Sequence, residues 1–324
     1  MGSFWGFLYR QLTFKPGPLP SNVNLKGKTA LVTGASGGLG VEACLELAAH
    51  GLSLVILGVR DPTKCDSIKS LLLSRRPDLD VQIWQVEQES LENIKAFADR
   101  AASLDRLDIV ILNAGVKGIH YAKSKSGHEL NTQVNHLGTA LLSLLLLGPL
   151  QTTATATGAP GRLTIVSSEN HFWVKLKEIN GPDTLEHLDD EATFGKDMDR
   201  YNVTKLLNVL WMRELSVKAS GNVVINAVNP GFCKSGLHRH HPGGASFAKM
   251  VGWTSAQGGH CLTDAAIMHA QDNGAYISEQ RVKSPSPFVL SKDGQKAQAK
   301  IWDETMRLLE QELPSSDLSA NLRP

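Results

Sequence analysis

Short apolar runs recur along the chain and alternate with stretches of helical periodicity. Six of these runs predict buried strands, at 28–34, 52–58, 81–87, 107–115, 162–168 and 222–231. Helical patterns lie between them, for example at 39–50, 90–103 and 131–147. Short all-apolar strands that alternate with helices indicate a parallel sheet covered on both faces. The pattern therefore predicts an α/β fold with a doubly wound parallel sheet of the Rossmann type.

No segment is rich enough in glycine, proline or serine to divide this pattern into separate domains. The stretch QTTATATGAPG at 151–161 is low in complexity but short, so we interpret it as a loop before the fifth strand. We expect an N-terminal arm at 1–26 and one catalytic domain at 27–324 that ends in a helical extension. The apolar run at 141–150 is too short to span a membrane and predicts a buried or subunit-interface helix.

The N-terminal arm begins with an apolar cluster, Phe4 to Leu8. This cluster is too short for a secretory segment or a membrane span, and no small-residue cleavage site follows it. Two interpretations stay open. The arm packs on the domain surface, or it makes a weak interfacial contact with Trp5 and Tyr9 near lipid headgroups and Arg10 and Lys15 on phosphates.

Composition and charge indicate which classes of partner and which cellular compartment to expect. The formal net charge of +1 gives no polyanion-binding surface, so we expect no nucleic-acid partner. The four cysteines, Cys44, Cys65, Cys233 and Cys261, are far apart and show no metal-ligand spacing. They predict reduced thiols and a cytoplasmic protein. Without a secretory segment, the Asn-Val-Thr tripeptide at Asn202 is not expected to carry a glycan.

The segment TGASGGLG at 33–40 joins the first strand to the first helix and carries the first candidate chemistry. Its glycines are spaced GxxxGxG, but they serve the same purpose as GxGxxG: they allow a tight turn and let a pyrophosphate approach a helix N-terminus. A tight turn without a ligand is the alternative, and the position directly after the first strand favours the nucleotide. We expect Gly34, Ser36, Gly38, Leu39 and Gly40 to bind a dinucleotide.

The end of the second strand selects between the two nicotinamide cofactors. In VILGVRD, Arg60 comes first, and Asp61 precedes Pro62, where a helix can start. We interpret Asp61 as a helix N-cap and Arg60 as the ligand of a 2′-phosphate, which favours NADP over NAD. The alternative is that Arg60 is a solvated loop cation.

Six segments resemble motifs of the classical short-chain dehydrogenases/reductases, in that family's order and over roughly residues 27–240. They are TGASGGLG, LNAG at 112–115, NTQVNHLG at 131–138, IVSS at 165–168, YNVTK at 201–205 and NPGFCKS at 229–235. The segments VILGVRD, DRYNVTKLLNVL and GAYISE are similar to the retinol-dehydrogenase-like branch found in many fungal biosynthetic reductases.

A tyrosine and a lysine in RYNVTKLLNV carry the second candidate chemistry. Tyr201 and Lys205 are four residues apart and share one face of a helix. A free tyrosine titrates near pH ~10, and a lysine ammonium together with an oxidised nicotinamide lowers that pKa. We expect Tyr201 to donate or accept the proton, and the resemblance implies that Lys205 also holds the nicotinamide ribose. An ordinary helix with a snorkelling lysine is the alternative.

The resemblance completes a catalytic set and further cofactor contacts. It implies that Ser168, rather than Ser167, hydrogen-bonds the substrate oxygen, and that Asn135 supports a water relay to the lysine. A turn-forming serine and a helix-capping asparagine are the alternatives. Glu87 stands where many relatives carry an aspartate near adenine, and Ser235 stands where a threonine is common. The other cofactor contacts that it implies are Asn113, Ala114, Gly115, Pro230 and Gly231.

The segment between Ser168 and Tyr201 is longer than in the simplest relatives. We interpret it as a substrate-facing insertion with His171, Phe172 and Trp173 in the pocket, although its acidic middle part is equally well a solvated excursion. The histidines of LHRHHPGG, His238, His240 and His241, lack a carboxylate or thiolate partner nearby, so we expect a substrate-lid loop and no metal.

These patterns predict an NADP(H)-dependent oxidoreductase that acts on a ketone or secondary alcohol of a hydrophobic small molecule, as a biosynthetic carbonyl reductase. Two alternatives stay open: non-redox chemistry on the same fold, such as dehydration, cyclisation or epimerisation, and a cofactor-binding scaffold without turnover. The resemblance also implies a homodimer through the helices that contain 131–147 and 201–217, unless the extended tail blocks that interface.

Overall fold

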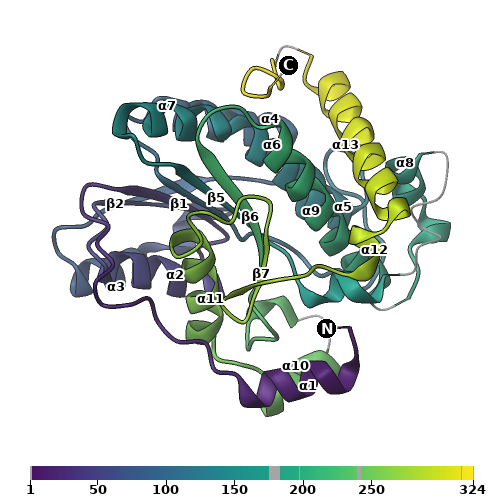
Figure 1. Cartoon of the computed structure of the whole chain (residues 1–324), viewed down its shortest axis with the longest axis horizontal. Helices are drawn as coiled ribbons and strands as arrows, with labels where there is room; N and C mark the ends of the chain where they lie inside the picture. Colours follow the sequence, from purple (N-terminus) through teal and green to yellow (C-terminus); the bar gives the residue numbers. More distant parts are fainter. Residues whose placement is uncertain (1, 175–182, 197, 239–241, 315, 324) are drawn as a thin grey trace.

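A computed structural model describes residues 2–174, 183–196, 198–238, 242–314 and 316–323. Its centre is one eight-stranded sheet in the order β3-β2-β1-β4-β5-β6-β7-β8 (Figure 1). The strands are β1 Thr29–Thr33, β2 Leu54–Val59, β3 Asp80–Gln85, β4 Ile109–Leu112, β5 Gly161–Val166, β6 Val223–Asn229, β7 Tyr276–Ser278 and β8 Arg281–Lys283. Only the β7–β8 pair is antiparallel among the strand pairs of this sheet. The predicted doubly wound α/β fold is confirmed.

Helices cover the two faces of the sheet, and each face has its own apolar core (Figure 1). One face carries α2 Gly38–Ala49, α3 Asp66–Arg75 and α11 Ser255–Ile267. The other carries α4 Leu91–Ala102, α6 Gly138–Leu145, α7 Leu147–Thr157 and α9 Asp199–Lys218. The strands are buried on both sides, which is why their sequences are continuous apolar runs instead of alternating ones.

A nearly continuous helical run extends from Leu130 to Thr157 through α5 Leu130–Thr132, a π-helical turn Gln133–Leu137, α6 and α7. By length and hydropathy it meets the criteria for a membrane span, but 78% of its most apolar window is buried inside the protein. Such burial is what a core helix of a globular domain shows. The expected buried helix at 141–150 is therefore confirmed.

The loop expected at 151–161 is wrong, because α7 continues to Thr157 and ends at Gly158, whose φ is +70°. The threonines there support the helix. Thr155 and Thr157 donate their hydroxyls to the carbonyls four residues earlier, and Thr153 accepts from the backbone of Leu107 at 2.8 Å. The low-complexity segment therefore forms most of the last two turns of α7, and Thr153 links this helix to the chain before β4.

The C-terminal extension contributes to the sheet as well as to a helix layer. Tyr276–Ser278, within GAYISE, forms β7, a strand that the apolar pattern did not predict. After β8, the chain forms α12 Pro287–Leu290 and α13 Lys292–Glu312. Helix α13 packs along α9, where the rings of Trp211 and Trp302 stack at 4.5 Å. Part of the helix face expected for a homodimer is therefore covered by the chain's own tail.

The N-terminal arm is packed on the domain through α1 Phe4–Thr13, which lies beside α10 Pro242–Val251 (Figure 1). The ring of Phe7 contacts those of Trp173 and Phe232, at 6.2 and 6.1 Å between centroids. Arg10, which the second interpretation placed on lipid phosphates, instead pairs with the carboxylates of Glu169 and Glu279. Packing of the arm on the domain is confirmed, and the lipid role of Arg10 is wrong.

The segment after Ser168 starts with a 3-10 helix, Glu169–Trp173. Its described acidic part, α8 Thr184–Asp189 and the turn Glu191–Thr193, packs toward α13. The carboxylate of Glu304 on α13 accepts from the backbone N–H of Thr184 at 3.0 Å. This part of the insertion therefore leans on the C-terminal helix.

Candidate active site

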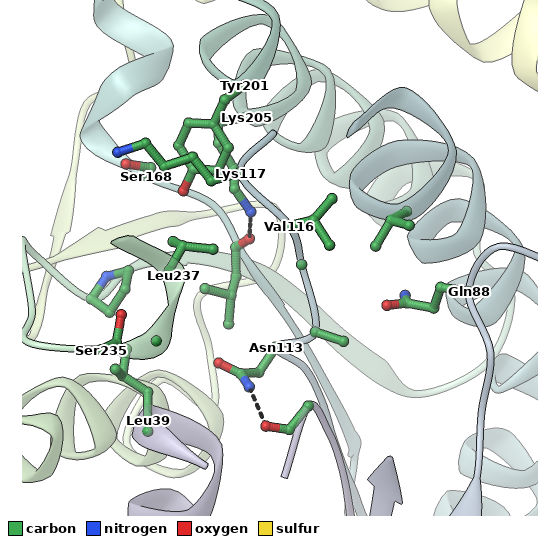
Figure 2. Close-up of a pocket in the computed structure, with 18 of the residues that line it drawn as sticks. Leu39, Gln88, Asn113, Val116, Lys117, Ser168, Tyr201, Lys205, Ser235 and Leu237 are labelled. Atoms are coloured by element: carbon green, nitrogen blue, oxygen red, sulfur yellow. Dashed lines mark hydrogen bonds between the residues drawn. The ribbon is translucent and has the colours of Figure 1, made fainter. Parts of the chain in front are cut away.

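A cleft of about 580 Å³ opens along the carboxyl ends of the parallel strands, and it collects most of the predicted site residues (Figure 2). The expected residues that line it are Gly34, Ser36, Gly38, Leu39, Arg60, Glu87, Asn113, Ala114, Gly115, Ser168, Tyr201, Lys205, Pro230, Gly231 and Ser235. Gly40 and Asn135 lie behind this lining as supports, and His171, Phe172 and Trp173 lie elsewhere.

The glycine loop is built from close backbone approaches. Gly34 has a φ of +67°, and a Cβ there would meet the Cα of Ala114 at 2.9 Å. A Cβ on Gly40 would lie only 2.5 Å from the carbonyl oxygen of Gly34. The side chain of Asn113 donates to the carbonyl of Thr33 at 2.9 Å and so ties this loop to the end of β4. Two glycines of the motif are therefore required by packing alone.

The N-terminus of α2 faces the cleft. The helix begins after Gly37, which offers no side-chain cap, and a Cβ on Gly37 would meet nothing within 4 Å. First-turn backbone N–H groups with open space before them are the donors that a pyrophosphate requires. The residues present thus fit the phosphates of a dinucleotide.

At the end of β2 the structure tests the expected role of Asp61, and the role of Arg60 as a phosphate ligand stays a prediction. Asp61 is the N-cap of a short 3-10 helix, Pro62–Lys64, and its carboxylate accepts from the backbone of Thr63 at 3.2 Å. The hydrogen bond from Thr63, with a smaller contribution from Lys64, lowers the pKa of Asp61. The N-cap prediction is confirmed. Arg60 is exposed and lines the cleft, where a ribose phosphate can reach it.

Tyr201 and Lys205 lie on one face of α9, both buried, and both line the cleft (Figure 2). The ammonium of Lys205 donates to the carbonyl of Val166 at 2.9 Å and stands 5.6 Å from the centre of the Tyr201 ring. The backbone of Lys205 is itself fixed, since its carbonyl accepts from the hydroxyl of Ser167 at 2.8 Å. Two hydrogen bonds to the end of β5 and the residue after it therefore hold Lys205, and with it this turn of α9, in place.

Burial sets the charge state of this pair. It raises the pKa of the Tyr201 phenol well above its ordinary value and lowers the pKa of Lys205 to about 8. The protein's own groups therefore keep Tyr201 protonated, which is the opposite of the lowering that we expected from Lys205 and an oxidised nicotinamide together. In the free protein desolvation outweighs the effect of the lysine, so a net lowering of the Tyr201 pKa requires the positive charge of the nicotinamide ring in addition.

Ser168 lies at the cleft two residues after β5, and a neighbour orients its hydroxyl. The hydroxyl donates to the side-chain oxygen of Asn170 and accepts from the backbone N–H of the same residue, both at 3.2 Å. Asn170 in turn donates to Asn202 on α9 at 2.7 Å. Because the Ser167 hydroxyl is buried on Lys205, Ser168 is the serine that can reach a ligand.

Asn135 occupies the π-helical turn Gln133–Leu137, a local widening that often marks functional sites. Its amide oxygen accepts from the backbone N–H of Val116 at 2.8 Å, and its amide nitrogen donates to the carbonyl of Val116 at 2.9 Å. A Cβ on Gly115 would lie between Asn135 and Lys205, at 3.0 and 3.8 Å. Asn135 therefore fixes the loop beside Lys205, and the water relay stays a prediction.

The three aromatic residues expected in the pocket turn away from it. His171 is buried behind Ser168: its Nδ1 donates to the Ser168 carbonyl at 2.7 Å, and its Nε2 accepts from the backbone of Ser286 at 3.0 Å. Burial lowers the pKa of His171 to about 4, which suits this neutral tautomer. Phe172 packs against the core, and Trp173 donates to the carbonyl of Gly2. The 3-10 turn after Ser168 directs all three away from the cleft.

The structure also brings residues to the cleft that the sequence did not single out. They are Lys117, Asn170, Met198, Phe232 and Leu237. Lys117 follows the LNAG segment by two residues, is buried, and holds its ammonium 5.8 Å from the centre of the Tyr201 ring (Figure 2). A buried lysine directly after that motif is a signal that could have been noticed.

The structure describes only part of the histidine-containing segment that we expected to form a lid without a metal. His240 and His241 lie outside the described residues, and His238 ends a 3-10 helix, Gly236–His238. Among the residues that the structure describes, no group of three histidine, cysteine, aspartate or glutamate side chains is placed to hold a metal ion.

Comparison with known proteins agrees with this geometry. The family profile described as short chain dehydrogenase matches residues 28–173. The short chain dehydrogenase sol3 of Alternaria solani is 58% identical over 285 residues, which cover 87% of this chain and 100% of that protein.

The chain belongs to the short-chain dehydrogenase family.

Other relatives and solved structures also align over most of the chain. The short chain dehydrogenase resG of Aspergillus sclerotiorum is 36% identical, with 92% of this chain and 88% of that protein covered. Among solved structures, a Shigella flexneri protein described as a short chain dehydrogenase complexed with NADP has a TM-score of 0.61 at 21% identity, with 81% of this chain and 100% of that chain covered. The oxidoreductase yciK of Escherichia coli has the same TM-score at 22% identity, with 82% and 99% covered. The fold, the oxidoreductase class and the likeness to fungal members are thereby confirmed.

Proposed function

We propose that this short-chain dehydrogenase is an NADP(H)-dependent carbonyl reductase that moves a hydride between the nicotinamide and a ketone or secondary alcohol. The observation that carries the proposal is the convergence of Tyr201, Lys205 and Ser168 on the cleft that the glycine loop also lines (Figure 2). Tyr201 and Lys205 come from α9 and Ser168 from the end of β5, so two independent elements build one proton-transfer site.

The chain's own residues divide the remaining tasks. The nicotinamide supplies the hydride when it is bound. Tyr201, which burial keeps as a neutral phenol, donates its proton to the carbonyl oxygen, and Ser168 donates a hydrogen bond to that oxygen as charge develops. Lys205 stands close enough to stabilise the resulting phenolate. Reduction requires the protonated form of Tyr201, and burial favours that form in the free protein.

NADP is favoured over NAD by Arg60. Its guanidinium lies at the end of β2 and lines the cleft, whereas Asp61 is occupied as a helix N-cap and cannot take the ribose hydroxyls. The Shigella flexneri neighbour complexed with NADP is consistent with this choice. We assign the phosphates to the N-terminus of α2, the adenine side to Glu87, and the nicotinamide side to Pro230, Gly231 and Ser235.

The substrate is proposed to be a hydrophobic small molecule. Val116, Leu130, Val134, Met198, Phe232 and Leu237 line the cleft. The fungal relatives sol3 and resG, both named short chain dehydrogenases, are consistent with the biosynthetic carbonyl reductase that we propose. Four free cysteines, all buried, fit a reducing compartment, and we place the protein in the cytoplasm.

The test is a cofactor titration followed by turnover on a panel of aromatic and aliphatic ketones. We expect wild-type protein to bind NADPH more tightly than NADH, and Arg60→Ala to lose about 1.5–3 kcal/mol of the NADPH preference. Tyr201→Phe should retain NADPH binding and lose about 10²–10⁴-fold in kcat. Lys64→Ala, which removes an exposed cation a few residues from Arg60, is the matched charge control.

Each alternative function has its own outcome. A cofactor-binding scaffold would be favoured if the wild-type protein bound NADPH but reduced none of the ketones, and if Tyr201→Phe bound NADPH equally well. Product formation without net oxidation of NADPH would favour dehydration, cyclisation or epimerisation on the same fold. Equal or tighter NADH binding would overturn the role given to Arg60.

A further inference from the structure

Helix α1 exposes four of its large apolar side chains. Trp5 is 77% exposed, Tyr9 69%, Leu12 56% and Phe4 54%. Trp5, Tyr9 and Leu12 follow one another at intervals of four and three residues, so they form one stripe along the helix. A surface helix of a globular protein normally turns such a stripe toward the core. The exposure of this stripe therefore needs a reason.

Polar contacts on the inner side hold the helix in this orientation. Gln11 is buried: its side chain donates to the carbonyl of Phe232 at 2.8 Å and accepts from the backbone N–H of the same residue at 3.2 Å. Arg10 pairs with Glu169 and Glu279 beneath the helix. Rotating α1 to bury its aromatic stripe would break these contacts and leave the backbone groups of Phe232 and the carboxylates of Glu169 and Glu279 without these partners. The outward stripe is thus specified by the fold.

Helix α10 continues the exposed apolar surface. It lies beside α1 (Figure 1), and its Met250 is 79% exposed. The two helices share Phe232 as a neighbour, since its ring contacts Phe7 of α1 and Phe247 of α10 at 6.1 and 5.5 Å. Phe232 also lines the active-site cleft. The α1–α10 face, defined as Phe4, Trp5, Tyr9, Leu12 and Met250, therefore adjoins the cleft.

The acid-base residues with a fixed charge on α1, α10 and their flanking segments are all basic. Residues 1–41 and 215–263, which include both helices, contain no aspartate or glutamate. Lys15 follows α1 and Lys249 precedes Met250, and both are exposed. Two such faces in a symmetric dimer would bring these cations together with no acidic partner from either helix. The charge therefore argues against a second copy and in favour of an anionic surface.

We propose that the α1–α10 face binds the surface of an anionic lipid bilayer, with the protein lying on the membrane and not crossing it. Tryptophan and tyrosine are the side chains best suited to the headgroup level, and Lys15 and Lys249 match anionic headgroups at the rim. Burial of the stripe in the interfacial region gains the hydrophobic free energy that the folded protein leaves unused. The proposal is independent of the substrate and cofactor assigned above.

The test is flotation of the full-length protein with vesicles of phosphatidylcholine alone or mixed with phosphatidylserine. We expect binding to the mixed vesicles that weakens as salt is raised, and little binding to phosphatidylcholine alone. Trp5→Ala with Tyr9→Ala should lower the partition coefficient at least ~10-fold. Lys15→Glu with Lys249→Glu should lower it by a similar factor on the anionic vesicles.

Two matched controls keep the test falsifiable. Val217 and Lys296 are exposed on other helices, so Val217→Ala and Lys296→Glu should leave vesicle binding unchanged. Folding of each variant is checked by its thermal transition and by NADPH binding. No binding to anionic vesicles at low salt would overturn the proposal. So would a dimer in sedimentation velocity that becomes monomeric on Trp5→Ala with Tyr9→Ala, because the face would then be a self-association surface.

Discussion

Two lysine side chains lie near the ring of Tyr201, and they come from different elements. Lys205 belongs to α9, and Lys117 follows β4, with their ammonium groups 5.6 and 5.8 Å from the ring centre. Burial lowers the pKa of both lysines, to about 8 for Lys205, and raises that of Tyr201. We expect both ammonium groups to help stabilise the Tyr201 phenolate.

Replacing Lys117 by methionine removes one of these cations while keeping an apolar chain of similar length. We expect the pKa of Tyr201 to rise further, so the alkaline limb of the reduction rate should move to higher pH. The acid limb of the oxidation rate should move the same way, because oxidation needs the phenolate. The check is the pH profile of kcat/KM in both directions. Lys117→Arg, which keeps the charge, should restore the wild-type limbs; identical profiles for wild type and Lys117→Met would contradict the argument.

Ser168, Tyr201 and Lys205 line the cleft, as the resemblance to the family and the shared helix face of the Tyr-Lys pair led us to expect; their roles stay predictions. The expectations that failed depend on distant packing. His171 and Trp173 were misplaced because the direction of the turn after Ser168 is set by partners far away in sequence, Ser286 and Gly2. No local pattern encodes contacts of that kind.

At the scale of elements, His128 joins three segments that are far apart in the chain. It lies just before α5, its Nδ1 contacts Asp189 at the end of α8, and its Nε2 contacts Glu312 at the end of α13 at 2.7 Å. Both ring nitrogens can donate to carboxylates only in the protonated imidazole. Although burial opposes the charge, the hydrogen bonds to Asp189 and Glu312 raise the pKa of His128 to about 9.

The pH dependence of stability follows from this bridge. The folded-state pKa of about 9 exceeds the ordinary value of 6.5, so the stabilisation is complete below that ordinary value and is lost as pH rises through about 9. His128→Gln should therefore cost on the order of 1–2 kcal/mol of unfolding free energy at slightly acidic pH and much less above the folded-state pKa. Urea unfolding at the two pH values measures this difference. His120→Gln, at an exposed position, is the control; an equal cost for His128→Gln at both pH values would refute the bridge.

The apolar pattern predicted some secondary-structure elements and missed others. All six predicted strands exist, because buried parallel strands are continuous apolar runs. The helix over Gln151–Thr157 was missed because its threonines satisfy their hydroxyls within the helix, a use that composition does not reveal. Strand β7 was missed because three residues are too few to form a pattern.

At the scale of the whole molecule, the C-terminal helix completes one of the two cores. Ile301, Trp302 and Leu309 of α13 are buried in the same apolar cluster as α4, α6 and α9. His136, one residue after Asn135, also hydrogen-bonds Thr305 of α13 at 2.9 Å. The tail therefore supports the π-helical turn that holds the site, and it covers α9, where we had expected a subunit contact.

Replacing Trp302 is the most direct way to measure how much the stability of the domain depends on α13. Its ring stacks on Trp211 of α9 at an interplanar angle of 16°, and the ammonium of Lys218 lies 5.4 Å from its centre. Trp302→Ala should lower the unfolding free energy by about 3–5 kcal/mol, since it removes a large buried ring and leaves a cavity beside α9. Lys296→Ala, on the exposed side of the same helix, should change it by less than ~0.5 kcal/mol. Denaturant unfolding, followed by far-UV circular dichroism, measures both. If the two variants were equally stable, α13 would be an appendage, and the face of α9 beneath it would again be available to a second subunit.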